Sequence, residues 1–412
     1  MTPKKIKVHS LTGRITPDLV WRAWRHVRSH RGAAGIDKVS LRMFEQNLQE
    51  NLDAVMRDLK RGTFEPHPLR RVVIPKGDGR TRPLGIPAVR DRVAQEVLRR
   101  LLSPIFEKLF HEDSYGFRPG RNCHQAVTRV LELRRQGYRW VLDADIQGFF
   151  DNLPHRVIMA AVAAEVADGN ILNLIEKFLR AGVLENGVFK PTTVGTPQGG
   201  VISPLLANIA LNYLDWQLAA AGFRFVRYAD DFVVLCRSAV RAQEARRFVE
   251  RILRDELGLT LSPDKTMVTK TAEGFSFLGF TIARSVRIRE KSLRKFQEKI
   301  RDLTRRHFNL DAELLRKLNA VIRGTARYFA TPFTRCRKQF EGLDEWIRMR
   351  LRCMKYGRKS REDNRRLSCR TLARMGLISM WEIACSVSTS SRVPRLGQAS
   401  TGPPSVGKPH AE

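Results

Sequence analysis

The stretch FRFVRYADDFVVLC, residues 223–236, sets the adjacent carboxylates Asp230 and Asp231 between two apolar segments. Both segments are rich in β-branched and aromatic residues, so the stretch predicts a short hairpin with the acidic pair at its tip. A solvated turn would also accommodate such a pair. Burying two carboxylates in an apolar run is costly, however, unless a hard cation such as Mg²⁺ neutralises them. The tip of this hairpin is therefore a candidate metal site.

A third carboxylate lies in a second strand-like run, VLDADI, residues 141–146, which leads into QGFFD at 147–151. Two-metal phosphoryl transfer needs carboxylates from separate strands, because ions roughly 3.5–4 Å apart must bridge the reacting groups. Asp145 is therefore the predicted third ligand. Strand alternation puts Asp143 on the same face, which makes it a rival, and Asp151 is also acidic and close in sequence.

Other motifs accompany these two acidic segments in a fixed order along the chain. They are PHPLRRVVIPK (66–76), RPLGIP (82–87), SYGFRPGR (114–121), GTPQGGVISPLLAN (195–208), LSPDKT (261–266) and FLGF (277–280). The ordered series resembles the group II intron-encoded reverse transcriptases, also called maturases. The resemblance implies an α+β fold shaped as a right-hand polymerase, with fingers, an antiparallel-sheet palm and a helical thumb, or maturase domain X.

The resemblance also implies a division of the chain. Residues 1–115 would form an N-terminal extension and fingers, 116–283 the palm with the remaining fingers elements, and 284–385 a basic helical thumb. Apolar residues at 3–4 spacing predict helices over 15–60, separated by a loop that by resemblance covers the template. From 64 to about 283, short apolar strands alternate with helices, and beyond about 284 the chain is expected to be helical. The Ser-, Gly- and Pro-rich segment 386–412 predicts a disordered tail, with no DNA-cutting HNH domain.

The charge of the chain favours a polyanionic partner. Lys and Arg number 74 against 42 Asp and Glu, a net charge of +32, and the sequence pI is about 10.8. Residues 284–374 alone hold 28 basic against 10 acidic side chains, a net of +18. Non-specific or ribosomal binding could use such a surface, and solvated helix faces could absorb part of it. A duplex or structured RNA explains most of it, because each neutralised phosphate releases a counterion.

Cysteine usage and hydropathy exclude several other classes of protein. The six cysteines include no Cys-x-x-Cys pair, so neither a zinc site nor a disulfide framework is indicated. No apolar segment approaches the length of a membrane span or a signal-peptide core. We expect a soluble cytoplasmic protein without a membrane partner.

The resemblance supplies roles for individual residues. The expected catalytic residues are Asp145, Asp230, Asp231 and Lys265, and the expected metal set is Asp145, Ile146, Asp230 and Asp231. The cofactor would be two Mg²⁺ ions, which Mn²⁺ could replace. One ion would lower the pKa of the primer 3′-hydroxyl and the other would hold the triphosphate. Lys265 would protonate the departing pyrophosphate.

The expected substrate-binding residues are Lys76, Arg82, Phe149, Gln198, Gly199 and Tyr228. Phe149 matches a steric gate against the 2′-hydroxyl, although it could be a core aromatic. Lys76 and Arg82 flank a Gly-Asp-Gly turn and could close on the triphosphate, or could be plain surface charges. The glycines after Gln198 would let the backbone approach a nucleic-acid strand, or form an ordinary turn. Tyr228 would pack against the primer terminus or fill the palm core.

The predicted function is RNA-directed DNA synthesis, in which a nucleotidyltransferase adds dNTPs to a primer 3′-hydroxyl on an RNA template. The implied partners are the intron RNA, a DNA or RNA primer, a DNA target and dNTPs; splicing assistance and retrohoming would accompany synthesis. An RNA-binding maturase without polymerase activity and a domesticated reverse transcriptase, for instance in antiviral defence, remain alternatives. An RNA-dependent RNA polymerase is disfavoured by Phe149. The oligomeric state stays open.

Overall fold

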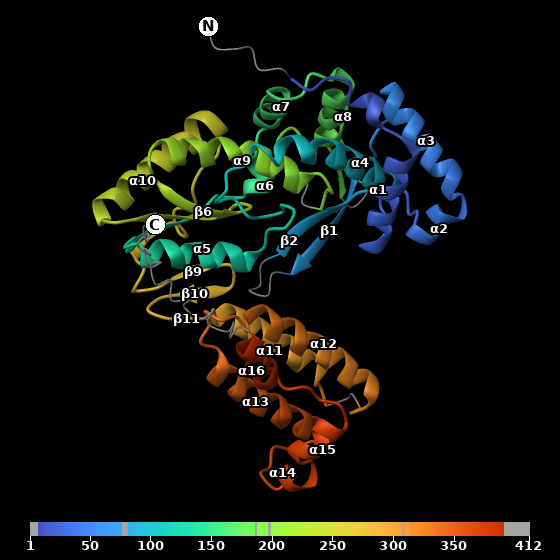
Figure 1. The fold of residues 1–412 in the computed structure, drawn as a ribbon. Helices are drawn as coiled ribbons and strands as arrows, with labels where there is room; N and C mark the ends of the chain where they lie inside the picture. Colours follow the sequence, from blue (N-terminus) through green and yellow to red (C-terminus); the bar gives the residue numbers. More distant parts are fainter. Residues whose placement is uncertain (1–6, 76–80, 186–187, 197–198, 307–308, 391–412) are drawn as a thin grey trace, which may run out of the picture. The chain divides into compact units, whose positions relative to one another are not determined.

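The computed structural model describes residues 7–75, 81–185, 188–196, 199–306 and 309–390. The chain divides into two compact units, Met1–Arg289 and Glu290–Glu412. The first unit combines helices with three β-sheets, and the described part of the second forms helices (Figure 1). The expected α+β class is therefore confirmed at the level of mixed secondary structure.

The first unit begins with helices, as the apolar spacing predicts. A 3₁₀ turn at Thr12–Arg14 precedes α1 (Pro17–Ser29), α2 (Leu41–Gln46) and α3 (Leu48–Arg61). The Thr16 hydroxyl caps α1 by accepting a hydrogen bond from the Leu19 amide, and proline occupies the first helical position. The buried faces of α1 and α3 pack on α4 (Val89–Phe106), which is enclosed by protein along most of its length.

A four-stranded sheet lies next along the chain. Its order is β2 (Thr81–Ile86), β1 (Leu69–Pro75), β4 (Val183–Glu185) and β5 (Val188–Lys190). Strands β1 and β2 are antiparallel with Pro75 opposite Thr81, and β1 pairs in parallel with β4. The hairpin predicted around residues 76–82 is thus present as two paired strands, while its turn lies outside the described residues.

The central sheet carries the acidic hairpin. Its order is β6 (Arg224–Tyr228), β7 (Asp231–Cys236), β3 (Trp140–Asp145) and β8 (Met267–Lys270), and every pair is antiparallel. The hairpin predicted over 223–236 is confirmed. Helices α5 (Cys123–Arg135), α9 (Ser203–Ala220) and α10 (Ala239–Arg251) pack on this sheet, which explains why its strands read as nearly continuous apolar runs.

The remaining elements of the first unit are short. They are α6 (Phe149–Asn152), α7 (His155–Ala163), α8 (Gly169–Arg180), a π-helical turn (Ile252–Leu257), and the three-stranded sheet of β9 (Phe275–Phe277), β10 (Phe280–Ile282) and β11 (Val286–Ile288). The expectation of helix beyond about 284 is wrong at β11. Val286 and Ile288 are buried while Arg287 between them is exposed, and this period of two forms a strand.

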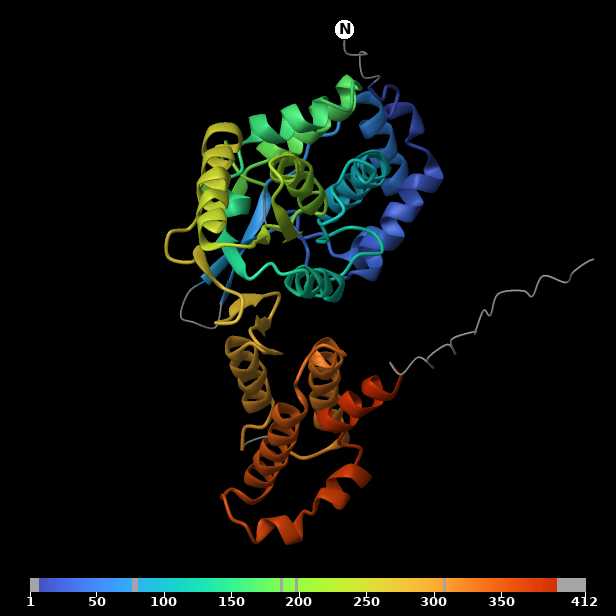
Figure 2. The ribbon, with the colours of Figure 1, turned by 60° about the vertical axis from the view of Figure 1, so that its left-hand side comes forward.

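The described residues of the second unit form α11 (Glu290–Leu303), α12 (Ala312–Phe329), α13 (Arg337–Tyr356), α14 (Asp363–Arg366), α15 (Cys369–Arg374) and α16 (Met380–Ser390) (Figure 2). Buried Asp344 on α13 accepts hydrogen bonds from the Ser379 hydroxyl and the amides of Met380 and Trp381. This cap starts α16, whose backbone stays helical to Ser390, so a tail beginning at 386 is wrong by five residues.

No helix in the described ranges is both long enough and apolar enough to cross a membrane.

Candidate active site

The turn between β6 and β7 brings the predicted carboxylates together. Tyr228 pairs with Asp231 across the hairpin, which leaves a two-residue turn of Ala229 and Asp230. Ala229 has a φ of 59°, a left-handed conformation that a two-residue hairpin turn demands. On the neighbouring strand, Asp145 lies directly opposite Asp231 in the β3–β7 register. Three carboxylates from two strands and one turn therefore meet at one end of the sheet.

Burial and neighbouring carboxylates raise the pKa of two aspartates in this cluster. Asp231 keeps contact with solvent, but the surrounding protein together with Asp230 and Asp145 raises its pKa to about 7. Half-buried Asp143 has its pKa raised to about 7 by burial first and then by Asp231. Arg289 lowers both pKa values. The rival residue Asp143 therefore belongs to the same electrostatic cluster.

Lys265 lies beside the third carboxylate. Its Nζ is 2.9 Å from Asp145 Oδ2, and both side chains are exposed to solvent, at 59% and 41%. The turn that carries Lys265 is tied to β3, because the Ser262 amide donates to the Asp145 carbonyl at 2.7 Å. The predicted general acid is therefore within reach of the carboxylate cluster, as an ion pair with Asp145.

The backbone of Ile146 is oriented by the same segment. Ile146 forms an isolated antiparallel bridge with Leu261, whose hydrogen bonds run from Ser262 to the Asp145 carbonyl and from the Gln147 amide to Thr260. This pairing uses neither the amide nor the carbonyl of Ile146 itself. Its side chain is aliphatic and has no ligand atom, so only the carbonyl suits the predicted role as a metal ligand.

The donor set fits a hard divalent cation. Among the described residues, no group of three or more His, Cys, Asp or Glu side chains already has the spacing of a metal site. The chemistry nonetheless matches, because carboxylate oxygens are what Mg²⁺ prefers. The raised pKa of Asp231 reflects burial first and then repulsion from Asp230 and Asp145, and a bound cation would relieve that repulsion. The Lys265 ammonium group already supplies positive charge on the Asp145 side.

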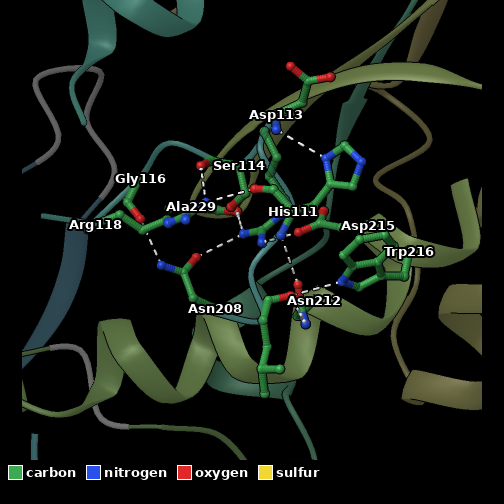
Figure 3. Close-up of polar contacts among 12 residues, drawn as sticks. His111, Asp113, Ser114, Gly116, Arg118, Asn208, Asn212, Asp215, Trp216 and Ala229 are labelled. Atoms are coloured by element: carbon green, nitrogen blue, oxygen red, sulfur yellow. Dashed lines mark hydrogen bonds and ion pairs between the residues drawn. The ribbon is translucent and has the colours of Figure 1, made fainter. Parts of the chain in front are cut away.

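A buried ion pair between Arg227 and Asp215 holds the turn in place, and Figure 3 shows Asp215, Asn208 and Ala229 within this network. Arg227, the residue before Tyr228, is 0% exposed, and its Nε donates to Asp215 Oδ1 on α9 at 2.7 Å. Its Nη1 donates to the carbonyl of Ala229 in the turn and to Asn208 Oδ1, each at 2.9 Å. The guanidinium group thus ties the turn to α9 through side-chain and backbone bonds.

Segment 113–118 completes this network. Asn208 Nδ2 donates to the Gly116 carbonyl at 2.7 Å, and the Tyr115 amide donates to the Arg227 carbonyl at 2.8 Å. A Cβ at Gly116 would lie only 2.3 Å from the Ala229 nitrogen. Glycine is required there because its backbone packs directly on the β6–β7 turn.

The structure describes some of the predicted substrate-binding residues fully, one by its backbone alone, and two not at all. Phe149 is 2% exposed in the core, with its ring 5.1 Å from that of Phe150, which is what a core aromatic shows; the gate stays a prediction. Tyr228 is half-buried, and burial followed by a hydrogen bond with Cys123 raises its pKa to about 12. Lys76 and Gln198 lie outside the described residues, and Arg82 is placed only by its backbone in β2.

Gly199 has a structural reason to be glycine. Its φ is 115°, and a Cβ there would lie 2.2 Å from the Gly85 carbonyl oxygen on β2. Near this contact is a cavity of about 290 Å³, whose lining includes Pro83, Gly85, Phe150 and Thr196. The cavity is lined by neighbours of the predicted nucleotide-binding residues, whose binding role stays a prediction.

Sequence reasoning missed the residues that hold the turn, namely Arg227, Asp215 and Asn208. The only available signal was the charge of Asp215 within α9, a helix whose other residues from 203 to 220 carry no charge. A lone charge in an apolar helix calls for a buried partner.

Comparison with known proteins agrees with this geometry. Residues 74–282 match the family "Reverse transcriptase (RNA-dependent DNA polymerase)", and residues 293–371 match "Group II intron, maturase-specific domain". The fold and acidic site therefore define the chain as a nucleic-acid polymerase of the reverse transcriptase class. More particularly, it belongs to the group II intron reverse transcriptase/maturase family.

Two curated relatives illustrate the similarity. The chain is 36% identical to Protein YkfC of Escherichia coli over 325 residues, which cover 69% of this chain and 85% of YkfC. It is 30% identical to the group II intron-encoded protein LtrA of Lactococcus lactis subsp. cremoris, covering 75% of this chain and 61% of LtrA. Among solved structures, a telomerase from Candida albicans gives a TM-score of 0.44 at 15% identity, covering 79% of this chain and 66% of that one.

The ion pair between Arg227 and Asp215 leads to a first prediction. Arg227→Met should lower the free energy of unfolding by about 3–5 kcal/mol, because it leaves Asp215 buried without a partner. The double variant Arg227→Met/Asp215→Leu should recover most of that loss. Urea denaturation followed by circular dichroism measures both. Arg224→Met, an exposed arginine on the same strand, is the matched control; an equal loss there would contradict the assignment.

The raised pKa of Asp143 leads to a second prediction. Its folded-state pKa of about 7 exceeds the ordinary value near 3.9, so folded protein holds a proton that unfolded chain has lost between these pH values. In magnesium-free buffer, stability relative to Asp143→Asn should therefore fall as pH rises from about 4 to about 7. Urea titrations at several pH values measure the difference. A flat difference for Asp143 would refute the raised pKa.

Proposed function

We propose that this chain is an RNA-directed DNA polymerase that copies its intron RNA by adding dNTPs to a primer 3′-hydroxyl. The observation that carries the proposal is the meeting of Asp145, Asp230 and Asp231 at one end of an antiparallel sheet. In this proposal residues 1–115 act as the N-terminal extension and fingers, 116–283 as the palm with the remaining fingers elements, and 284–385 as the thumb. Family membership supports the reaction, and the basic second unit supports an RNA partner.

Asp145, Asp230 and Asp231, with the Ile146 carbonyl, would hold two Mg²⁺ ions. When bound, these ions would lower the pKa of the primer hydroxyl and neutralise charge on the departing pyrophosphate. The protein contributes the fixed placement of the carboxylates, because the Ala229 carbonyl and the Asp145 backbone are both held by hydrogen bonds. Water need not reorganise around them as the reaction proceeds.

Lys265 would act as the general acid. Its ammonium group lies 2.9 Å from Asp145, which supports a position from which it would donate a proton to the pyrophosphate oxygen. Lys76 and Arg82, from the β1–β2 hairpin, would clamp the triphosphate, and Arg82 is suited to bidentate contact with phosphate. Gln198 and Gly199 would border the incoming nucleotide beside the cavity near β2.

Assistance to splicing is a second candidate activity, favoured by the charge of the second unit. A net of +18 over residues 284–374 accompanies the match to the maturase-specific domain over residues 293–371. Such a surface would bind the intron RNA through its phosphates and stabilise its folded form. The resulting ribonucleoprotein would insert the intron into a DNA target by reverse splicing and copying.

Removal of one proposed metal ligand tests the polymerase activity. Asp230→Ala should reduce primer extension with dNTPs on an RNA template by at least about 10²-fold, because the electrostatic stabilisation of the transition state is lost. Asp255→Ala, at an exposed carboxylate, is the matched control. Undiminished synthesis by Asp230→Ala would overturn the assignment. If that variant still binds intron RNA and promotes its splicing, the second activity is independent of the first.

The steric gate requires its own measurement. Phe149→Val should raise the ratio of ribonucleotide to deoxynucleotide incorporation, because a smaller side chain would no longer collide with the 2′-hydroxyl. The ratio is measured on one enzyme preparation with competing nucleotides, so a loss of stability does not affect it. Leu153→Ala removes a comparable core contact at a fully buried residue and should leave the ratio unchanged. An unchanged ratio in Phe149→Val would assign the ring to the core alone.

A further inference from the structure

Phe117 combines two unfavourable properties. Its side chain is 58% exposed although it is a large apolar ring, and its backbone has a φ of 56°, in the left-handed region that non-glycine residues rarely adopt. Residues held in such conformations gather where surrounding structure imposes them, and this often occurs at functional sites. Segment 114–121 is one of the sequence motifs to which the proposed chemistry assigns no role.

The residues on either side fix Phe117 in this position. The Gly116 backbone lies against the Ala229 backbone and accepts a hydrogen bond from Asn208. Arg118 is 8% exposed; its Nη1 donates to the Ser114 carbonyl at 2.7 Å, and its Nη2 is 2.7 Å from Glu107 Oε1. With both neighbours anchored in the protein, the backbone at Phe117 is held in place, and its ring lies 58% exposed.

The Phe117 ring lies beside the catalytic turn. Its centroid is 6.4 Å from that of Tyr228, with the two planes inclined by 44°. Tyr228 directly precedes the turn, and its hydroxyl is held by a hydrogen bond with Cys123 at the start of α5. Two rings from separate segments are thus fixed next to each other, close to Asp230 and Asp231.

Aromatic faces at such a place suit a nucleic-acid strand. Bases and sugars stack on exposed rings with little dependence on sequence, which a copying enzyme requires. The proposed nucleotide clamp comes from the β1–β2 hairpin, whereas these rings flank the β6–β7 turn, where a 3′-hydroxyl must arrive. We propose that Phe117 and Tyr228 form an aromatic platform that supports the terminal nucleotide of the primer strand. This inference rests on the proposed polymerase function and adds Phe117 as a specific primer-binding residue.

Binding of an annealed primer–template tests the platform without turnover. Fluorescence anisotropy in EDTA should show affinity for a labelled DNA primer on an RNA template reduced by about 5- to 100-fold in Phe117→Ala, the effect of losing one stacked base. Phe117→Trp should retain the affinity. Tyr213→Ala, which removes a 43% exposed aromatic ring from α9, is the matched control. Because the Phe117 ring is exposed, the thermal unfolding midpoint should stay unchanged in Phe117→Ala.

Steady-state primer extension supplies the second readout. Phe117→Ala should raise the KM for the primer–template and leave the KM for dNTPs unchanged. Unchanged affinity and KM for primer–template, or an increase confined to the KM for dNTPs, would overturn the proposal. The proposal would also be overturned if Phe117→Ala lost a dimer in analytical ultracentrifugation while its nucleic-acid binding stayed intact. The ring would then contact a second copy of the chain. If wild-type protein makes no DNA, the polymerase proposal fails, while the anisotropy still decides whether the platform binds a primer strand.

Discussion

The contact between Arg227 and Asp215 is the constraint on which the acidic site depends. Both side chains are essentially excluded from water, and the cost of desolvating two charges means that such a pair adds little net stability. The pair instead restricts how β6 can pack against α9. The Arg227 guanidinium group can satisfy Asp215, Asn208 and the Ala229 carbonyl together only when β6 and α9 have one relative position. That position sets the place of the β6–β7 turn.

A fixed turn matters because the carboxylates that it carries repel one another. Burial and neighbouring carboxylates raise the pKa of Asp231 to about 7, so without other forces the cluster would favour a looser arrangement. The hydrogen bonds to the Ala229 carbonyl and the pairing of β3 with β7 hold it together. The protein therefore overcomes the repulsion between the acids when it folds, before any substrate binds.

The acidic hairpin and its partner strand could be predicted from sequence because both follow from local periodicity. The strands around Asp230 and Asp231 and the run ending at Asp145 appear where the apolar pattern places them. Arg227 could not be predicted in this way. It shares β6 with Arg224, yet Arg224 is exposed, whereas Arg227 is fully buried against its partner Asp215 on α9. Such pairing over distance is invisible to a pattern of single residues.

Two glycines also make contacts that the sequence alone does not reveal. Gly199 suggests close approach to a substrate, but the described contact that requires glycine is with the Gly85 carbonyl on β2. Gly116 likewise must be glycine because its backbone packs against that of Ala229 in the β6–β7 turn. In both places a Cβ would separate two protein segments before it could meet a ligand. Gly116 and Gly199 therefore act as close-packing points between segments, and in the proposed function the surfaces that face nucleic acid would be formed by the side chains beside them.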